Sequence, residues 1–200
     1  MILPIVAYGD PVLRAETQEI TKDYPDLDRL IDNMFETMYA ANGIGLAAPQ
    51  VGLDIRMFIV DLDSVAQDAE EVEDPEERER LLQYKGFKKV FINPIILEET
   101  GEEWPFEEGC LSIPNIREEV KRQDTIRIEY EDENFNLVEA QFDDMAARVI
   151  QHEYDHIEGV LFTDKLNPLK RRLLTRRLAN ISKGNVKVDY KMRFPQRKGR

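Results

Sequence analysis

The stretch Gln151-His152-Glu153-Tyr154-Asp155-His156-Ile157-Glu158-Gly159 contains both histidines of the 200-residue chain, and they stand four residues apart. On an α-helix, side chains at i and i+4 share a face with Cβ atoms about 5–6 Å apart, so two imidazoles can converge on one cation. Glu153 then points about 100° away, beside the cation rather than at it. The pattern predicts a metal-binding helix with His152 and His156 as ligands and Glu153 as general base. The alternative, two ordinary surface histidines, is disfavoured because Met145, Val149 and His152 keep one periodic inward face.

The residues on either side of this helix predict a fold of the α+β class. Apolar residues recur at helical spacing from residue 27 to residue 38 and indicate a helix that ends at Asn42-Gly43. β-branched and alternating apolar runs predict strands over residues 55–62, 90–97, 126–130 and 137–142, the last two paired as a hairpin. Asp143-Asp144 are suitable caps for the histidine helix, and Asn167-Pro168 begin a basic helix that reaches Ser182. We therefore expect small antiparallel sheets packed around a central metal-binding helix.

Composition and charge restrict the compartment and the partners. With one cysteine, no disulfide can close within the chain, which favours a reducing cytoplasm, and no run approaches the roughly 18 apolar residues of a membrane span. The apolar start over residues 1–6 has no basic segment before it and predicts no secretory signal. Net charge is −13, but residues 1–164 carry 14 Lys and Arg against 39 Asp and Glu, whereas residues 165–200 carry 13 against 1. The basic end either meets a polyanion or folds onto the acidic body of the protein.

The identity of a third metal ligand decides the class of protein, because a catalytic metal site keeps three protein ligands and one open position. The metzincin pattern would place a third histidine where this chain has Phe162, and no glutamate occurs after Glu158. With Asp164 as the third ligand, the protein would be a small zincin-type metallopeptidase. The single cysteine, Cys110, offers a thiolate that suits Zn²⁺ or Fe²⁺, although a lone cysteine is often only a small buried hydrophobe. A closed structural site in a non-catalytic protein would need a fourth protein ligand.

Three segments together resemble the motifs of peptide deformylases, in the order expected for that family. They are Gly43-Ile44-Gly45-Leu46-Ala47-Ala48-Pro49-Gln50, Glu108-Gly109-Cys110-Leu111-Ser112 and Gln151-His152-Glu153-Tyr154-Asp155-His156. The resemblance runs from Ile2 to about Lys170, and the basic helix is similar to that of the common bacterial form. The resemblance implies a single catalytic domain over residues 1–182 with an acidic insertion at residues 64–86. We expect this insertion to be a solvated loop and a short exposed helix. Residues 183–200 would be a loosely ordered basic tail.

The resemblance implies an enzyme that removes the N-formyl group from formylmethionine on nascent polypeptides and releases formate. Cys110, His152 and His156 would hold one divalent metal, Fe²⁺ in the cell, with Zn²⁺, Ni²⁺ or Co²⁺ able to take its place. Hydroxide formed at the cation would attack the formyl carbon, with Glu153 as general base and then acid. By similarity, the side-chain amide of Gln50 and the backbone N–H of Leu111 would stabilise the oxyanion.

The remaining expectations concern substrate and partners. The bare backbone at Gly43 and Gly45 could pair with an extended peptide, and Ile44, Met145 and Val149 would line a pocket for its methionine side chain. Two further side chains, Glu108 and Asp155, are candidates for hydrogen bonds that orient the ligands. The basic C-terminal helix and tail are predicted to contact ribosomal RNA, and no membrane is implied.

Overall fold

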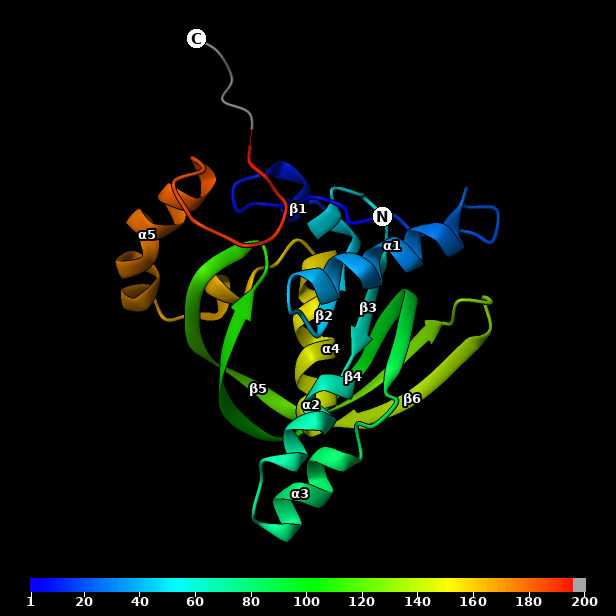
Figure 1. Ribbon diagram of the computed structural model, residues 1–200. Helices are drawn as coiled ribbons and strands as arrows, with labels where there is room; N and C mark the ends of the chain where they lie inside the picture. Colours follow the sequence, from blue (N-terminus) through cyan, green and yellow to red (C-terminus); the bar gives the residue numbers. More distant parts are fainter. Residues whose placement is uncertain (196–200) are drawn as a thin grey trace.

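The helix that carries both histidines, α4 (Asp144–Ile157), lies at the centre of a computed structural model that describes residues 1–195 (Figure 1). It is enclosed by a five-stranded antiparallel sheet in the order β2-β3-β4-β5-β6. The strands are β2 (Gly45–Ala47), β3 (Met57–Asp61), β4 (Lys88–Cys110), β5 (Ile113–Glu131) and β6 (Leu137–Asp143). The strands β4 and β5 are long, and Figure 1 shows them curving around the helix. Four register shifts between them, each a bulge or irregularity, allow this curvature.

The main core forms where α4 packs on the inner face of the sheet. At Ala146 and Ala147 the side chains are small and buried, so the sheet can approach the helix closely there, and Ile150 is fully buried. The sheet contributes aromatic and β-branched side chains to the same cluster, among them Phe58, Val60, Phe91, Ile126 and Ile128. Because these apolar groups leave water together, the packing fixes α4 against β2, β3 and β5.

The other elements cover the outside of this unit. Helix α1 (Leu27–Ala40) packs on β2 and β3 in a second apolar cluster, and η2 (Ala48–Val51) follows β2. Helix α5 (Pro168–Ser182) buries Leu174, Leu178 and Ile181 against β5, after the short helix η4 (Phe162–Lys165). The side chain of Asn167 caps α5 by accepting a hydrogen bond from the Lys170 amide at 2.9 Å. Both ends predicted for the basic helix, at Asn167-Pro168 and Ser182, are therefore confirmed.

The α+β class and the hairpin of β5 with β6 are confirmed, but several details differ. The strand predicted over residues 90–97 continues to Cys110. Its second half is mostly exposed and has no alternating apolar pattern, so it is extended because it pairs with β5. The acidic insertion folds as α2 (Asp63–Gln67), η3 (Asp68–Glu70) and α3 (Pro75–Leu82), and only α3 is without buried residues. Asp143 occupies the N-cap position of α4 without a side-chain capping bond, and Asp144 pairs with Arg80 instead.

The C-terminal segment is also more ordered than expected. Strand β7 (Met192–Arg193) pairs with β1 (Ile5–Val6), next to η1 (Pro11–Arg14), and this two-stranded sheet is parallel rather than antiparallel. The prediction of a loosely ordered tail is therefore wrong for the residues up to Pro195, and its last part, residues 196–200, lies outside the described residues. Among residues 1–195, no helix combines the length and apolar character needed to cross a bilayer.

Candidate active site

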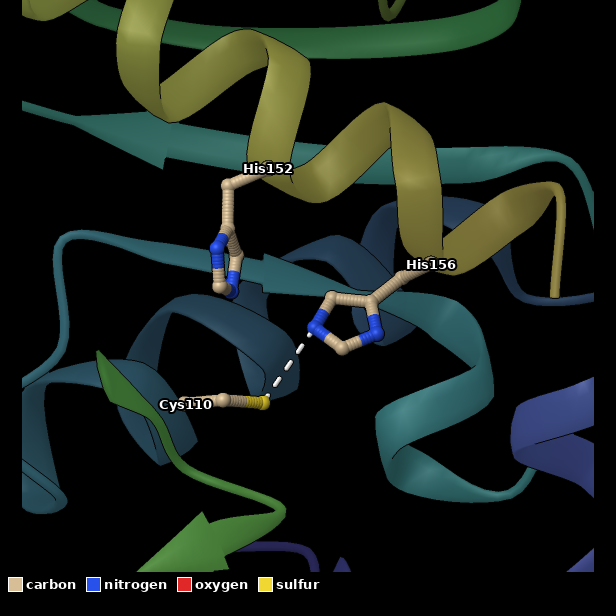
Figure 2. Close-up of side chains that lie close together, drawn as sticks. All are labelled: Cys110, His152 and His156. Atoms are coloured by element: carbon tan, nitrogen blue, oxygen red, sulfur yellow. Dashed lines mark hydrogen bonds between the residues drawn. The ribbon is translucent and has the colours of Figure 1, made fainter. Parts of the chain in front are cut away.

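The predicted metal ligands come together in one cluster. Cys110 ends β4, and His152 and His156 lie one turn apart on α4, with all three ligand atoms within 4.8 Å of one another. The sulfur of Cys110 lies 3.3 Å from His156 Nε2, and Figure 2 shows it facing both imidazoles. Around a tetrahedral zinc, with Zn–S about 2.3 Å and Zn–N about 2.0–2.1 Å, ligand atoms are roughly 3.3–3.6 Å apart. The cluster therefore fits a single cation after a small contraction.

A buried carboxylate orients His152 within this cluster. His152 Nδ1 lies 2.9 Å from Glu108 Oε2, so the other ring nitrogen of His152, Nε2, is left to bind a cation. Burial lowers the pKa of His152, but hydrogen bonds with Cys110 and Glu108 outweigh burial and raise the pKa to about 10, so a cation must displace a proton from this imidazole in order to bind. Burial holds the pKa of His156 well below its usual value, so this imidazole is neutral, as a metal ligand must be. Among the described residues, His156 Nδ1 has no hydrogen-bond partner.

Two arginines that the sequence did not single out hold Glu108 in place. Arg122 of β5 donates from Nε at 2.6 Å and from a terminal nitrogen at 2.9 Å, and Arg148 of α4 donates at 3.0 Å. Arg148 also donates to the backbone oxygens of Val120 and Trp104. Arg148 stands four residues before His152, so its helical position indicated the same face. Arg122 lies in a charged run that carries no signal of burial.

The carboxylate of Glu153 lies beside the cluster, almost completely buried, and Glu153 Oε2 has no partner among the described residues. Burial raises the pKa of Glu153 to about 7. Gly45 leaves room for this carboxylate, because a Cβ at residue 45 would collide with Glu153 Oε1. The segment rich in small residues therefore has a structural reason: it brings backbone within contact distance of the buried acid.

Gln50 and Leu111 belong to two separate segments beside the cluster, η2 and the turn between β4 and β5. The Gln50 side chain accepts a hydrogen bond from the Ala47 amide at 2.8 Å, which aims its Nε2 at the Cys110 sulfur 3.5 Å away. Leu111 directly follows Cys110 in the turn between β4 and β5, and it is half-buried. Gln50 Nε2 therefore reaches the cluster through the Cys110 sulfur, and Leu111 stands next to that cysteine in the chain.

A cavity of about 910 Å³ opens onto the cluster. All five predicted substrate-binding residues line it: Gly43, Ile44, Gly45, Met145 and Val149. The residues 187–190 of the C-terminal segment also line it, which the sequence-based prediction of a loose tail missed. The cavity is large enough for several residues of an extended peptide.

The two aspartates considered for this site lie outside the cluster. Asp155 pairs with Arg122 at 2.7 Å and with Lys165 at 3.3 Å, and within residues 1–195 its side chain has no hydrogen bond to a candidate ligand. Asp164 is paired with Arg14 and accepts from the Leu161 amide at 2.9 Å. Within residues 1–195, Cys110, His152 and His156 are the only group of three or more possible metal-binding side chains whose ligand atoms lie close enough to share one ion. The interpretation with Asp164 as third ligand is therefore wrong.

Together these features define a class: α+β enzymes with one candidate metal centre beside a buried carboxylate, open to a peptide-sized cavity. Comparison with known proteins gives the family. The family described as "Polypeptide deformylase" matches residues 2–172. A peptide deformylase of Christiangramia forsetii is 60% identical over 99% of this chain and 98% of its own length, and one of Flavobacterium psychrophilum is 56% identical over 99% and 100%.

Solved structures agree with the sequence comparison. The crystal structure of a peptide deformylase from Legionella pneumophila is 32% identical, with a TM-score of 0.74 over 92% of this chain and 98% of its own. The Thermotoga maritima peptide deformylase is 38% identical, with a TM-score of 0.69 over 84% and 99%. The chain belongs to the polypeptide deformylase family, and it is an enzyme with a deformylase function.

Proposed function

We propose that this enzyme removes the N-formyl group from formylmethionine at the start of nascent polypeptides and releases formate. The observation that carries the proposal is the grouping of Cys110, His152, His156 and a buried Glu153 beside a peptide-sized cavity, which Cys110, His152 and Glu153 line. Family membership supports the reaction, and the geometry supports how this chain performs it.

Cys110, His152 and His156 would hold one divalent cation, Fe²⁺ in the cell, with Zn²⁺, Ni²⁺ or Co²⁺ as substitutes. When bound, the cation would polarise the formyl oxygen and lower the pKa of water from about 15.7 toward neutrality. The hydrogen bond from His152 to Glu108 supports this assignment, because metal-binding histidines usually donate their second nitrogen to a carboxylate. A thiolate ligand donates more charge than a third imidazole, so the acidifying effect on water is smaller in this site.

Glu153 is the proposed general base and acid. Its carboxylate would take a proton from the attacking water and then pass it to the amine nitrogen as the C–N bond of the formamide breaks. A pKa raised to about 7 by burial suits both steps, because the carboxyl can exchange a proton near neutral pH. The products are formate and a free methionine amine.

Gln50 and Leu111 are the proposed oxyanion donors. The Gln50 amide is held by the Ala47 N–H and points to the cluster, so it can donate as negative charge develops on the formyl oxygen. The backbone N–H of Leu111 would donate from the opposite side. One such donor is worth about 2.7–4 kcal/mol in the transition state.

The cavity accounts for substrate binding in this proposal. Ile44, Met145 and Val149 would contact the methionine side chain, while the backbone at Gly43 and Gly45 would pair with the extended peptide. The catalytic domain would be residues 1–182, with the ordered part of the C-terminal segment packed onto it. The working compartment would be the cytoplasm, where nascent chains emerge.

The basic C-terminal end is proposed to contact ribosomal RNA. The arginines of α5 stand beside Leu169 and Leu173, which are 69% and 71% exposed. Deleting residues 196–200 and replacing Arg172 and Arg176 with alanine should weaken ribosome association and flatten its dependence on salt. An unchanged, salt-insensitive affinity would contradict the ribosomal role.

The reaction itself is tested by measuring formate release from a formyl-Met peptide. Chelation should abolish it and added Fe²⁺, Zn²⁺, Ni²⁺ or Co²⁺ should restore it. Glu153→Gln should keep its metal and lose about 10²- to 10⁴-fold in kcat, whereas Cys110→Ala should lose the metal. Activity that survives complete chelation would refute the proposal, and loss of metal in Glu153→Gln would indicate a closed structural site instead.

A further inference from the structure

Residues 186–195, the C-terminal strap, form one wall of the cavity. In Figure 1 the segment after α5 runs past the turn between β4 and β5 on its way to β1. Its half-buried side chains alternate with exposed ones, in the order Val186, Val188, Tyr190, Met192 and Phe194. Val186, Met192 and Phe194 pack on the apolar cluster beneath α5, while residues 187–190 line the cavity. The strap is therefore anchored at both ends with its middle exposed to the substrate site.

The strap is also hydrogen-bonded to the residues around Cys110. The Asn115 side chain donates to the backbone oxygen of Lys187 at 3.1 Å. The Tyr190 hydroxyl donates to the backbone oxygen of Leu111 at 2.7 Å. Across the same turn, the Tyr8 amide donates to the backbone oxygen of Ser112 at 2.8 Å. Both carbonyls of the two-residue turn that follows Cys110 are thus held by segments from the chain's two ends.

We propose that Tyr190 is a positioning residue for deformylation, because its hydroxyl holds Leu111, the residue whose backbone N–H is the proposed donor to the formyl oxygen. The inference rests on the proposed function of Leu111. A turn of two residues has little internal hydrogen bonding, so outside anchors decide how steadily its N–H points. The effect belongs to the transition state, since the oxyanion exists only there, and should therefore appear in kcat rather than in KM.

The test compares metal-loaded wild type with Tyr190→Phe, which removes the hydroxyl and keeps the ring. Tyr39→Phe is the matched control, since it also removes a hydrogen-bonded hydroxyl, but one that contacts Asp61 away from the cavity. Formate release from formyl-Met-Ala gives kcat and KM. The metal content per chain and the thermal midpoint are measured on the same samples, and calorimetry gives the Kd of the product Met-Ala. Tyr190→Phe should lower kcat about three- to tenfold at full metal content, with KM and product Kd within about twofold. The control should match wild type in all of these.

A second variant separates positioning from a local effect of the lost hydroxyl. Phe194→Ala loosens the strap at a residue outside the cavity lining and should also lower kcat. The double variant should lose little more than the worse single one, because both changes release the same hydrogen bond.

Unchanged kcat in Tyr190→Phe, a fall in kcat explained by lost metal, or fully additive losses would each overturn the inference. Wild type that releases no formate would instead refute the proposed function, and the inference with it.

Discussion

Replacing Glu108 with glutamine is expected to weaken both the fold and metal binding. Glu108 is 5% exposed, and its carboxylate accepts three hydrogen bonds from arginines, two from Arg122 at 2.6 and 2.9 Å and one from Arg148 at 3.0 Å. An amide keeps one acceptor oxygen and turns two N–H donors toward these guanidinium groups. Removing one partner of a buried ion pair costs about 3–5 kcal/mol, because the other charge stays buried without compensation. We expect a loss of that size in the free energy of unfolding.

The same substitution removes the group that orients His152. Glu108 Oε2 lies 2.9 Å from His152 Nδ1, and loss of such a partner lowers metal affinity by about 10- to 100-fold. Urea unfolding of metal-free protein measures the first effect, and competition with a chelator measures the second. Glu139→Gln is the matched control, because its pair with Arg127 is exposed to solvent and should contribute little to stability.

The pH dependence of the Glu108→Gln effect has a definite sign. Desolvation raises the pKa of Glu108, but the hydrogen bonds from Arg122 and His152 outweigh it and hold the pKa well below its usual value. A carboxyl with a lowered folded-state pKa stabilises the protein above its unfolded pKa of about 4.3 and loses that contribution as pH falls through the folded value. The difference in unfolding free energy between wild type and variant should shrink below about pH 4, as Glu108 takes up a proton in the unfolded chain. A variant as stable as the control, with unchanged metal affinity, would refute the reasoning.

Three further predictions test other parts of the site. Gly45→Ala should displace the Glu153 carboxylate and lower kcat/KM about 10²-fold at unchanged metal content, whereas full activity would contradict the close contact. Asp164→Asn should keep its metal and lose about 1 kcal/mol of stability by thermal unfolding, because the ion pair of Asp164 with Arg14 is partly exposed. Desolvation raises the pKa of Asp164, but the hydrogen bond from Arg14 outweighs desolvation and lowers it. The stability that the ion pair contributes is therefore lost as pH falls below about 4. Met145→Ala should lower kcat/KM for formyl-Met peptides about tenfold and narrow the preference over formyl-Ala peptides, and an unchanged ratio would place the side-chain pocket elsewhere.

The parts of the structure that were predictable from sequence are those with a local cause. The helix of His152 and His156 follows from the spacing of polar and apolar residues along one face. The hairpin of β5 with β6 and the cap at Asn167 likewise depend on neighbours in the chain. Cys110 could be reached only by exclusion of other ligands and by resemblance, because nothing near it in sequence indicates which helix it will face.

Other features depend on contacts between distant segments. Arg122 is buried only because β5 pairs with β4 and α4 packs across both, so its charged surroundings in sequence give no warning. The C-terminal strap is different, because its signal was present. Apolar residues alternate with polar ones from Val186 to Phe194, which is the period of an extended strand. The low overall apolar content of the tail concealed that alternation, and the parallel partner, β1, lies at the other end of the chain.

The buried charges explain how one pairing of β4 with β5 is selected. Exchanging a buried ion pair for apolar residues is often neutral or stabilising, so this cluster is poorly explained as a source of stability. It does depend on register: Glu108 is paired with Glu118 in the ladder, and a slip of one residue would turn its side chain to the opposite face, away from Arg122 and His152. The same slip would turn Cys110 away from the histidines. We infer that the charges penalise a one-residue slip of this pairing. Hydrogen exchange tests the inference: β4–β5 amides should lose protection in Glu108→Gln, whereas protection equal to wild type would contradict it.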